Sequence, residues 1–466
     1  MASIKEVLDF ISDILWGYPM IILLVGTHLF LTIRLKFPQR KIFTAIKLSL
    51  AKDKDGDGDV SQFGALATAM AATIGTGNIV GVGTAIALGG PGAVFWCWIT
   101  GLLGIATKYG EGLLAVKYRK VSDQGHMVGG PMYALEYGLG AKWAGILFAI
   151  FTALAAFGIG STVQANAIST LANEVMDVTP LYSAILVTVL VGLVLIGGIK
   201  GIARVCTALV PLMAFFYVLG CFYILYVNSE FIWPALKLIV NCAFDPAAAG
   251  GGFVGGSILL TARYGIARGL FSNESGLGSA PIVAAAAKTK NPVRQALVSS
   301  SGTFWDTVVI CAITGIVIVS SVLSYVSVDD ASSSGRLFGH ILEMKSSSMN
   351  GSSLTKMAFN VIPYIGAPLL MFGLFTFAFT TILGWAIYGQ RAVEYIFGYN
   401  GVKYYTWMFL IAVFVGAVIS LEVVWTLADI FNALMAIPNL LALLLLSKVL
   451  VDDTNKYLWD DRLDEE

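Results

Sequence analysis

A short polar stretch interrupts a long apolar run near the start of the chain. The run, residues 63–89, is long enough to cross a bilayer, which takes about 20 residues, yet Thr73-Ile74-Gly75-Thr76-Gly77-Asn78 lies at its middle. A glycine destabilises a helix interior by about 1 kcal/mol relative to alanine, and an unpaired main-chain group in hydrocarbon costs several kcal/mol more. The pattern predicts a helix that unwinds at mid-membrane, where its free N–H and C=O groups face a ligand.

A second interrupted run lies at residues 257–287 and contains Phe271-Ser272-Asn273-Glu274-Ser275-Gly276-Leu277-Gly278. Where two half-helices meet, one end presents N–H groups with positive dipole and the other presents C=O groups with negative dipole. A zwitterionic amino acid needs both. We expect the first break to bind its carboxylate through Gly75–Gly77, and the second to supply oxygens for its ammonium from Phe271–Asn273.

Two acidic residues of the predicted spans, Glu274 and Asp306, could have a functional role. Glu274 is the acid inside an interrupted run, and its role stays open. It either stabilises the unwound backbone or receives the ammonium, or it forms an ion pair with Arg268 or Arg263. Asp306 could relay a proton, but its place nearer the predicted cytoplasmic end favours a structural contact with a loop cation.

Neutral oxygen donors follow in a later span, at Thr380 and Thr381. Adjacent threonines often bond to their own helix carbonyls. Alternatively, both hydroxyls face the first broken helix and help to bind Na⁺, since neutral oxygens add no unpaired charge at mid-membrane. Trp385 lies one turn after Thr381 and is expected to bound the substrate pocket. Gln164, one turn beyond Gly160, is expected to reach the same site.

The composition indicates an integral membrane protein. The 466 residues are 57% hydrophobic and 12% charged, about half the charged fraction of a soluble domain. The formal net charge of zero gives no support to nucleic-acid binding. The five cysteines have no C-x-x-C spacing, and the three histidines lie far apart, so neither set predicts a metal site.

Apolar runs between residues 16 and 446 predict about eleven transmembrane helices, after an amphipathic surface helix at residues 4–13. Lys and Arg concentrate in alternate short loops, which places those loops in the cytoplasm. We therefore expect a cell-membrane protein with its N-terminus outside the cell and its C-terminus in the cytoplasm. Lys108 and Glu111 lie three residues apart on one helical face and are expected to pair.

The spans divide into two units that each begin with an interrupted helix. An odd number of spans in each unit forces inverted topology, which is typical of secondary transporters with a site between the repeats. The expected segments are 1–60 (surface helix, first span and cytoplasmic loop), 61–228 (first five-helix unit), 229–256 (extracellular connection), 257–448 (second five-helix unit) and 449–466 (cytoplasmic tail).

Several strings resemble the alanine/glycine:cation symporter family. They are residues 71–79 (AATIGTGNI), 89–96 (GGPGAVFW), 104–109 (GIATKY), 129–133 (GGPMY), 269–274 (GLFSNE) and 377–385 (FAFTTILGW). The resemblance implies an all-α, leucine-transporter-like fold of two inverted five-helix repeats, here with one extra N-terminal helix. It also implies Na⁺-coupled, sometimes H⁺-coupled, uptake of alanine or glycine.

The resemblance also implies ion ligands by position. A sodium site is expected from the carbonyls of Ala71, Ile74 and Phe377 and the hydroxyls of Thr380 and Thr381. Thr73 and Asn78 fall where related folds build a second sodium site. The full set expected around the substrate is Thr73, Gly75, Thr76, Gly77, Asn78, Gln164, Phe271, Ser272, Asn273, Glu274, Gly276 and Trp385.

The sequence therefore predicts a symporter with Na⁺ as coupling ion, no organic cofactor, and a small amino acid and the lipid bilayer as partners. An ion channel would need a continuous polar lining, whereas the polar residues concentrate at one depth. An intramembrane enzyme would need a nucleophile–base pair or a metal cluster, and neither stands out. A nucleobase or another small zwitterion stays open as substrate, as do Na⁺ against H⁺ and alanine against glycine.

Overall fold

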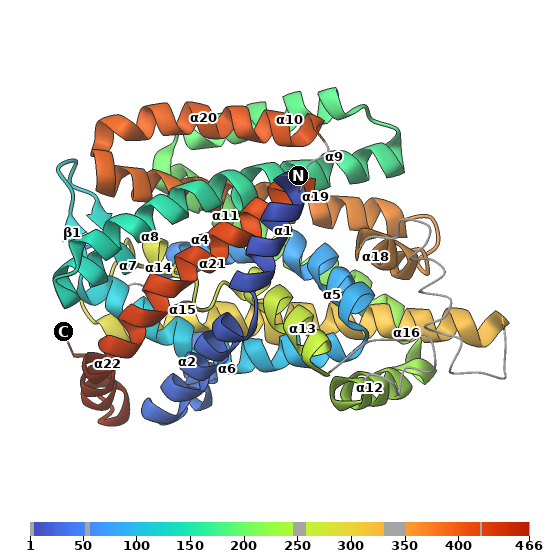
Figure 1. Cartoon of the computed structure of the whole chain (residues 1–466), viewed down its shortest axis with the longest axis horizontal. Coiled ribbons are helices and arrows are strands. Elements are labelled where there is room, and N and C mark those ends of the chain that lie inside the picture. The colour runs from blue at the N-terminus through green and yellow to red at the C-terminus, as the bar shows by residue number, and fades with distance from the viewer. Residues whose placement is uncertain (1–3, 52–55, 246–257, 330–350, 420–421, 466) are drawn as a thin grey trace.

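The computed structural model describes residues 4–51, 56–245, 258–329, 351–419 and 422–465. This part of the chain is almost entirely helical, apart from one hairpin of β1 (Lys120–Val121) and β2 (Met127–Val128). Many of the long helices run along one common direction (Figure 1), as expected for a bundle that crosses a bilayer. The all-α class predicted from the sequence is confirmed.

The helices are α1 (Ile4–Leu15), α2 (Tyr18–Arg34), α3 (Ile42–Ser49), α4 (Gln62–Thr73), α5 (Val82–Gly89), α6 (Gly92–Lys117), α7 (Pro131–Tyr133), α8 (Lys142–Ala155), α9 (Val163–Met176), α10 (Pro180–Leu195), α11 (Gly198–Val227), α12 (Ser229–Phe244), α13 (Ile258–Asn273), α14 (Pro281–Ala284), α15 (Pro292–Thr303), α16 (Ala312–Asp329), α18 (Gly351–Phe359), α19 (Gly366–Phe397), α20 (Tyr399–Val418), α21 (Glu422–Leu445) and α22 (Ser447–Thr454). A 3-10 turn lies at Pro38–Lys41, and π-helical turns lie at Gly77–Gly81, Ala134–Gly138, Ala156–Thr162, Phe304–Cys311 and Asn455–Trp459.

By length and apolar composition, seven helical stretches of the described chain can cross a membrane. The α4–α5 pair makes an eighth, bent by 49° at its break. The other three predicted spans correspond to α6, α10 and α13, of which α10 is apolar but only 16 residues long. The total of eleven spans and the internal repeat therefore stay predictions.

Two elements differ from the sequence-based expectations. The connection predicted at residues 229–256 contains α12, which packs against α6 and α16. The second interrupted run was expected to resume as a half-helix, but α13 is followed by irregular chain and then by α14, which has four residues. Positive φ angles at Gly276 and Gly278 and the proline that begins α14 keep this stretch out of a regular helix.

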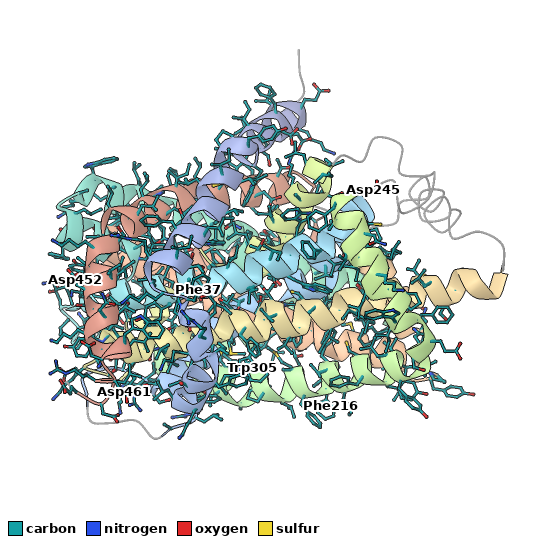
Figure 2. The ribbon with its side chains drawn as sticks, turned by 90° about the horizontal axis from the view of Figure 1, so that it is seen from below. Phe37, Phe216, Asp245, Trp305, Asp452 and Asp461 are labelled. Atoms are coloured by element: carbon teal, nitrogen blue, oxygen red, sulfur yellow. The ribbon has the colours of Figure 1, made fainter. Side chains whose placement is uncertain are left out.

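The sides of the bundle are apolar and its ends carry charge. Phe216 on α11 and Trp305 on the π-helical turn after α15 project from the side (Figure 2), where 38% and 37% of their surfaces are exposed. In the same view Asp452 and Asp461 lie at one end of the helices, and Asp245 lies toward the other. This is the distribution that a bilayer requires, with charges outside the hydrocarbon.

Small residues allow the central helices to approach closely. α6 packs against both α13 and α15. A Cβ added at Gly269 of α13 would lie 3.2 Å from the Thr100 Cβ of α6, and one added at Gly104 would lie 3.0 Å from the Ser275 Cβ. Glycine therefore places α6 directly behind the second break, as in other tightly packed membrane helices.

A polar assembly holds together the end of the bundle that the sequence assigns to the cytoplasm. Val60, before α4, forms a parallel bridge with Ala287, after α14. Arg119, after α6, donates to four carbonyl oxygens, those of Asp57 (2.9 Å), Ala285 (3.0 Å), Ala287 (2.8 Å) and Thr289 (2.5 Å). These contacts join the chain entering the first interrupted run to the chain leaving the second.

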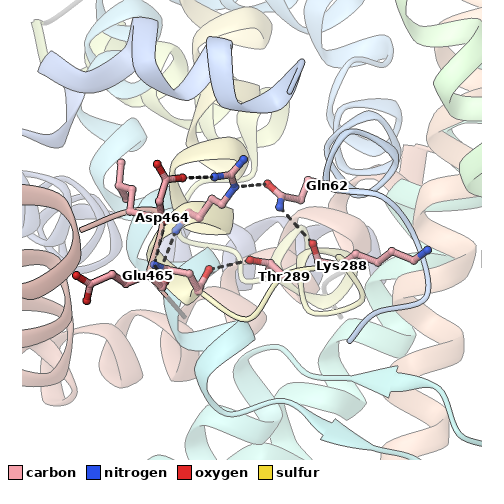
Figure 3. A network of polar contacts seen from close by, with 8 residues as sticks. Gln62, Lys288, Thr289, Asp464 and Glu465 are labelled. Carbon is pink, nitrogen blue, oxygen red and sulfur yellow. Dashed lines mark hydrogen bonds and ion pairs between the residues drawn. The ribbon is translucent and has the colours of Figure 1, made fainter. Parts of the chain in front are cut away.

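The C-terminal tail lies against the same region (Figure 3). The Asn291 Nδ2 donates to the carbonyl oxygens of Leu463 (3.3 Å) and Glu465 (3.0 Å). Arg294 lies 3.3 Å from a carboxylate oxygen of Asp464 and donates through Nε to the Gln62 Oε1 (3.4 Å). The tail thus links the N-terminal ends of α15 and α4.

We expect Arg119→Ala to destabilise the protein more than any surface arginine does. The substitution leaves four carbonyls without their charged donor, and each such hydrogen bond contributes about 1.5–3 kcal/mol. The apparent Tm in detergent should fall by several degrees. Arg204→Ala on the exposed side of α11 is the matched control and should leave the Tm within a degree. Equal Tm values for both variants would contradict the role assigned to Arg119.

Candidate functional site

The first interrupted run is broken at the predicted place. The helix α4 ends before Ile74, whose ψ of 88° lies outside the helical region. The Gly75 N–H donates to the Asn78 Oδ1 (2.9 Å), and the Thr76 N–H donates to the Gln164 Oε1 of α9 (3.4 Å). Side-chain amides therefore hold the main-chain donors that the break sets free. A carboxylate of a ligand can replace those amide oxygens.

Glycine brings the two interrupted runs into contact. A Cβ added at Gly77 would lie 3.0 Å from the Phe271 Cδ1 and 3.2 Å from the Ser272 Cα. A Cβ added at Gly75 would overlap with the Thr381 hydroxyl of α19. The first break thus faces the second break on one side and α19 on the other, and larger residues would force these elements apart.

The second break has an irregular backbone. Glu274, Gly276 and Gly278 have φ angles of +55°, +101° and +81°, a region that L side chains rarely adopt. The Ser275 N–H turns back to the Asn273 Oδ1 (2.9 Å). The N–H groups of Glu274 and Leu277 also bond locally, so those of Gly276 and Gly278 are the ones that other helices have to pair.

Glu111 of α6 supplies much of that support. Its Oε1 accepts hydrogen bonds from the Gly276 N–H (2.9 Å), the Gly278 N–H (3.0 Å) and the Asn439 Nδ2 of α21 (2.7 Å). The Asn439 Nδ2 also donates to the Gly276 carbonyl (2.9 Å). One buried carboxylate and one amide thus replace the helical hydrogen bonds that the positive φ angles prevent.

The predicted Lys108–Glu111 pair does not form. Glu111 points to the second break, and within the described chain the Lys108 Nζ has no hydrogen-bond partner. The Lys108 side chain instead lines a small cavity of about 10 Å³ with Thr73 and Asn273, which is room for a single water molecule. The expectation was wrong because the main chain of the second break takes the carboxylate.

The ion-pair alternative for Glu274 is also wrong. Its carboxylate accepts a hydrogen bond from the Ser279 hydroxyl (2.5 Å). Arg268 pairs with Asp429 (3.3 Å), and Arg263 pairs with Asp13 (2.5 Å). Glu274 is buried beside the break, so a role toward backbone or substrate is the alternative that remains.

Asp306 lies at the centre of the site. The expectation that it contacts a loop cation was wrong. It is buried on the π-helical turn after α15. Its carboxylate accepts from the Asn78 Nδ2 (2.8 Å), the Ser272 hydroxyl (2.9 Å) and the Thr307 hydroxyl (2.6 Å). Asp306 therefore connects the two breaks. An acid inside an apolar span is a functional signal in itself, and this signal is present in the sequence.

The two threonines of α19 behave differently. The Thr381 hydroxyl donates to the Ala71 carbonyl of α4 (3.0 Å), whereas the Thr380 hydroxyl donates to the carbonyls of Thr376 and Phe377 in its own helix (3.0 Å each). Thr381 thus faces the first interrupted run, and Thr380 follows the local alternative. The ligand set expected for Na⁺ (Ala71, Ile74, Phe377, Thr380 and Thr381) is buried as a whole, and its donor atoms are oxygens of the kind a hard cation prefers.

Trp385 and Gln164 both contact a π-helical turn, Ala156–Thr162. A Cβ added at Gly160 in this turn would overlap with the Trp385 side chain, so glycine makes room for the indole. Trp385 also packs edge-on against Tyr388, with ring centroids 5.4 Å apart. The Gln164 Nε2 donates to the Ile159 carbonyl (3.1 Å), which directs its Oε1 to the first break.

A cavity of about 480 Å³ leads to the breaks from the end of the bundle opposite Arg119. It is lined by Thr76 of the first break, Phe271 of the second, and farther out by Arg268, Asp429 and Glu174. We call it the vestibule. It brings a solute to the level of the two breaks without passing the polar assembly at the other end.

Comparisons with known proteins agree with this geometry. The model of the sodium:alanine symporter family matches residues 1–466. The chain is 45% identical to the sodium/alanine symporter AgcS of Methanococcus maripaludis, over 96% of each chain. It is 48% identical to an uncharacterized transporter of Haemophilus influenzae, over 98% of this chain and 96% of the relative.

Other similarities mark the breadth of the group. The chain is 34% identical to a probable sodium/glutamine symporter, GlnT, of Bacillus subtilis, over 97% of this chain and 91% of the relative. The solved structure of MhsT in complex with L-phenylalanine has a TM-score of 0.56 at 15% identity, covering 84% of this chain and 89% of that one. That likeness confirms the leucine-transporter-like fold. The chain belongs to the sodium:alanine symporter family, whose members are transporters and not enzymes.

Proposed function

We propose that the protein couples inward movement of Na⁺ to uptake of a small neutral amino acid, alanine or glycine. The observation that carries the proposal is the contact between the two breaks, in which Gly77 lies against Phe271 and Ser272. N–H groups for a carboxylate and oxygens for an ammonium then lie within one amino acid's length. The name of the AgcS relative supports alanine as the substrate.

The walls of the site support a small substrate. Trp385 packs on Gly160, and Phe271 packs on Gly77, so an aromatic ring bounds each side of the breaks. Asp306 is held by Asn78, Ser272 and Thr307 and leaves little room for a long side chain. A methyl group or a hydrogen suits this space better than the glutamine named for the GlnT relative.

Na⁺ is proposed to bind between α4 and α19. The Thr381 hydroxyl now donates to the Ala71 carbonyl; a cation placed between the two oxygens would take lone pairs from both once the hydroxyl rotates. The ion would fix the first break against α19 and so preorganise the donors of Gly75 and Thr76. Each Na⁺ that enters at 100 mV contributes about 2.3 kcal/mol to uptake.

The two ends of the bundle favour alternating access over a channel. The vestibule reaches Thr76 from one end, while the Val60–Ala287 bridge and Arg119 hold the other end together. Transport then requires the first end to close and the second to open. We propose that the vestibule end faces outward and the basic loops face the cytoplasm.

Uptake into proteoliposomes tests this function, with Na⁺ and pH gradients imposed separately. Labelled alanine should accumulate under a Na⁺ gradient and exchange with unlabelled alanine in counterflow. Glycine should compete, and glutamine and nucleobases should compete poorly. Accumulation driven by pH alone would replace Na⁺ by H⁺, and the absence of counterflow would reject a carrier mechanism.

Thr381→Ala should raise the Na⁺ concentration that gives half-maximal uptake by about tenfold or more. The substitution removes one oxygen, and a hydrogen bond to a charged group contributes about 1.5–3 kcal/mol. Thr381→Ser keeps the oxygen and should stay close to the unsubstituted protein. Thr380→Ala is a second control and should leave the Na⁺ dependence close to that of the unsubstituted protein, because the Thr380 hydroxyl bonds within α19. Unchanged Na⁺ dependence in Thr381→Ala would place the ion elsewhere.

Glu111→Ala should abolish uptake and lower stability, because it leaves the Gly276 and Gly278 N–H groups without their acceptor. Each buried unpaired donor costs about 1–3 kcal/mol. Glu111→Gln retains an acceptor oxygen and should keep measurable uptake. Uptake per folded molecule and the Tm in detergent are the measurements; full activity in Glu111→Ala would show that the second break does not depend on this carboxylate.

Gly160→Ala should reduce alanine uptake, because its methyl group overlaps with Trp385 and pushes the indole toward the breaks. Glycine uptake should suffer less than alanine uptake, since glycine needs no space for a methyl group. Gly192→Ala in α10, whose added Cβ would lie 3.8 Å from its nearest neighbour, is the control. Equal losses for both amino acids would argue against Trp385 as the wall of the pocket.

A further inference from the structure

An arginine and an aspartate face each other on the wall of the vestibule. The Arg268 Nη2 of α13 lies 3.3 Å from the Asp429 Oδ2 of α21, and the guanidinium lies 5.6 Å above the centre of the Phe271 ring. The two side chains are 17% and 22% exposed. A second cavity, of about 390 Å³, shares Arg268, Phe271, Thr426 and Asp429 with the vestibule. The ion pair therefore lies between the vestibule and this second cavity, next to Phe271 of the second interrupted run.

The geometry of this pair leaves binding capacity unused. One nitrogen meets one oxygen, whereas arginine and a carboxylate often form two parallel hydrogen bonds. The Arg268 Nε is buried and has no hydrogen-bond partner in the part of the chain that the structure describes. An ion pair held by one nitrogen–oxygen contact is weaker than one with two parallel hydrogen bonds. A free carboxylate that offers two oxygens can therefore compete for this guanidinium.

The aspartate is held in place from outside the transporter core. The Trp16 Nε1, at the start of the turn after α1, donates to the Asp429 carbonyl (3.0 Å), and the Thr426 hydroxyl donates to the Asp9 carboxylate of α1 (2.9 Å). The amphipathic helix α1 packs along α21. These contacts fix the main chain at Asp429 independently of Arg268.

We propose that Arg268 and Asp429 form an outer binding station for a zwitterionic amino acid. The substrate carboxylate pairs with the Arg268 guanidinium, and its ammonium pairs with the Asp429 carboxylate. This inference rests on the proposed function, since it concerns the same class of substrate before it passes Phe271. With about 480 Å³ of space the vestibule does not select by side-chain size, so the station binds zwitterions and the breaks select among them.

The station differs from the central site in its need for Na⁺. Both of its charges come from side chains, whereas the central site is proposed to be organised by the ion between Ala71 and Thr381. Binding at the station should therefore persist in Na⁺-free buffer. A pair that serves only to clamp α13 to α21 would bind no amino acid under those conditions.

A cysteine in the vestibule makes this measurable. The five native cysteines are free and buried, so Thr170→Cys on the exposed vestibule wall supplies a selective target for a membrane-impermeant methanethiosulfonate. We expect alanine to slow its labelling in Na⁺-free buffer, and alaninamide and propionate, which each lack one charge, to require at least tenfold higher concentrations. Thr381→Ala in this background should keep the protection.

Arg268→Gln and Asp429→Asn should each weaken protection by alanine at least tenfold in Na⁺-free buffer. Arg263→Gln, five residues earlier on α13 and paired with Asp13, should leave it unchanged. An unaltered labelling rate without ligand shows that each variant is folded; where Arg268→Gln fails this check, Arg268→Lys, which keeps the charge but loses the fork, replaces it and should weaken protection.

The outcomes separate the station from the proposed function. Protection by alanine that appears only with Na⁺ overturns the station and leaves symport intact. Protection in Na⁺-free buffer that survives both Arg268→Gln and Asp429→Asn also overturns it. Protection by no amino acid under either condition, together with no uptake, rejects the proposed function itself.

Discussion

The main chain freed at two breaks inside the membrane has to be paired, because hydrocarbon offers no water to its N–H and C=O groups. This constraint accounts for most of the unusual residues in the core. Asn78 and Gln164 hold the N–H groups of the first break. Glu111 accepts from the Gly276 and Gly278 N–H groups of the second, and Asn439 donates to the Gly276 carbonyl. Asp306 then connects the two through Asn78 and Ser272. A buried polar network of this kind is stable only when it is nearly complete.

The same network indicates how the main-chain N–H groups of the breaks could form a binding site. An amide oxygen that holds an N–H group can be exchanged for a substrate carboxylate with little change in hydrogen bonding. Some buried polar atoms beside the breaks have no hydrogen-bond partner within the described chain, among them the Thr76 hydroxyl and the Asn273 and Lys108 nitrogens. Unpaired polar atoms are costly in the interior, so a ligand or water at the breaks would complete their hydrogen bonding.

Glycine and aromatic residues give this site its size. Gly75, Gly77 and Gly160 let Thr381, Phe271 and Trp385 approach the breaks. The aromatic rings occupy space that a large substrate would need. At the end of the bundle that the vestibule enters, Arg268, Asp429 and Glu174 add charge to its lining. At the other end Arg119 and the C-terminal tail hold together the segments that enter the first interrupted run and leave the second.

The sequence by itself determined the membrane class, the position of both breaks and the transporter family. These follow from local facts, since apolar length, glycine content and characteristic strings are properties of neighbouring residues. It also singled out Gln164 and Thr381, whose place on a helical face can be counted from Gly160 or Trp385. The structure places both against the first break.

Only the tertiary structure decided which distant groups meet. The carboxylate of Glu111 lies one turn from Lys108, so helical spacing predicts an ion pair, yet it binds the main chain of the second break. The depth of Asp306 in its span predicted a contact with a loop cation, but a π-helical turn directs the carboxylate to Asn78 and Ser272. Sequence patterns likewise did not predict that α14 is short or that the connection at residues 229–256 contains α12. Partners more than 150 residues apart are chosen by packing and by the need to pair buried polar groups, and neither can be read from local spacing.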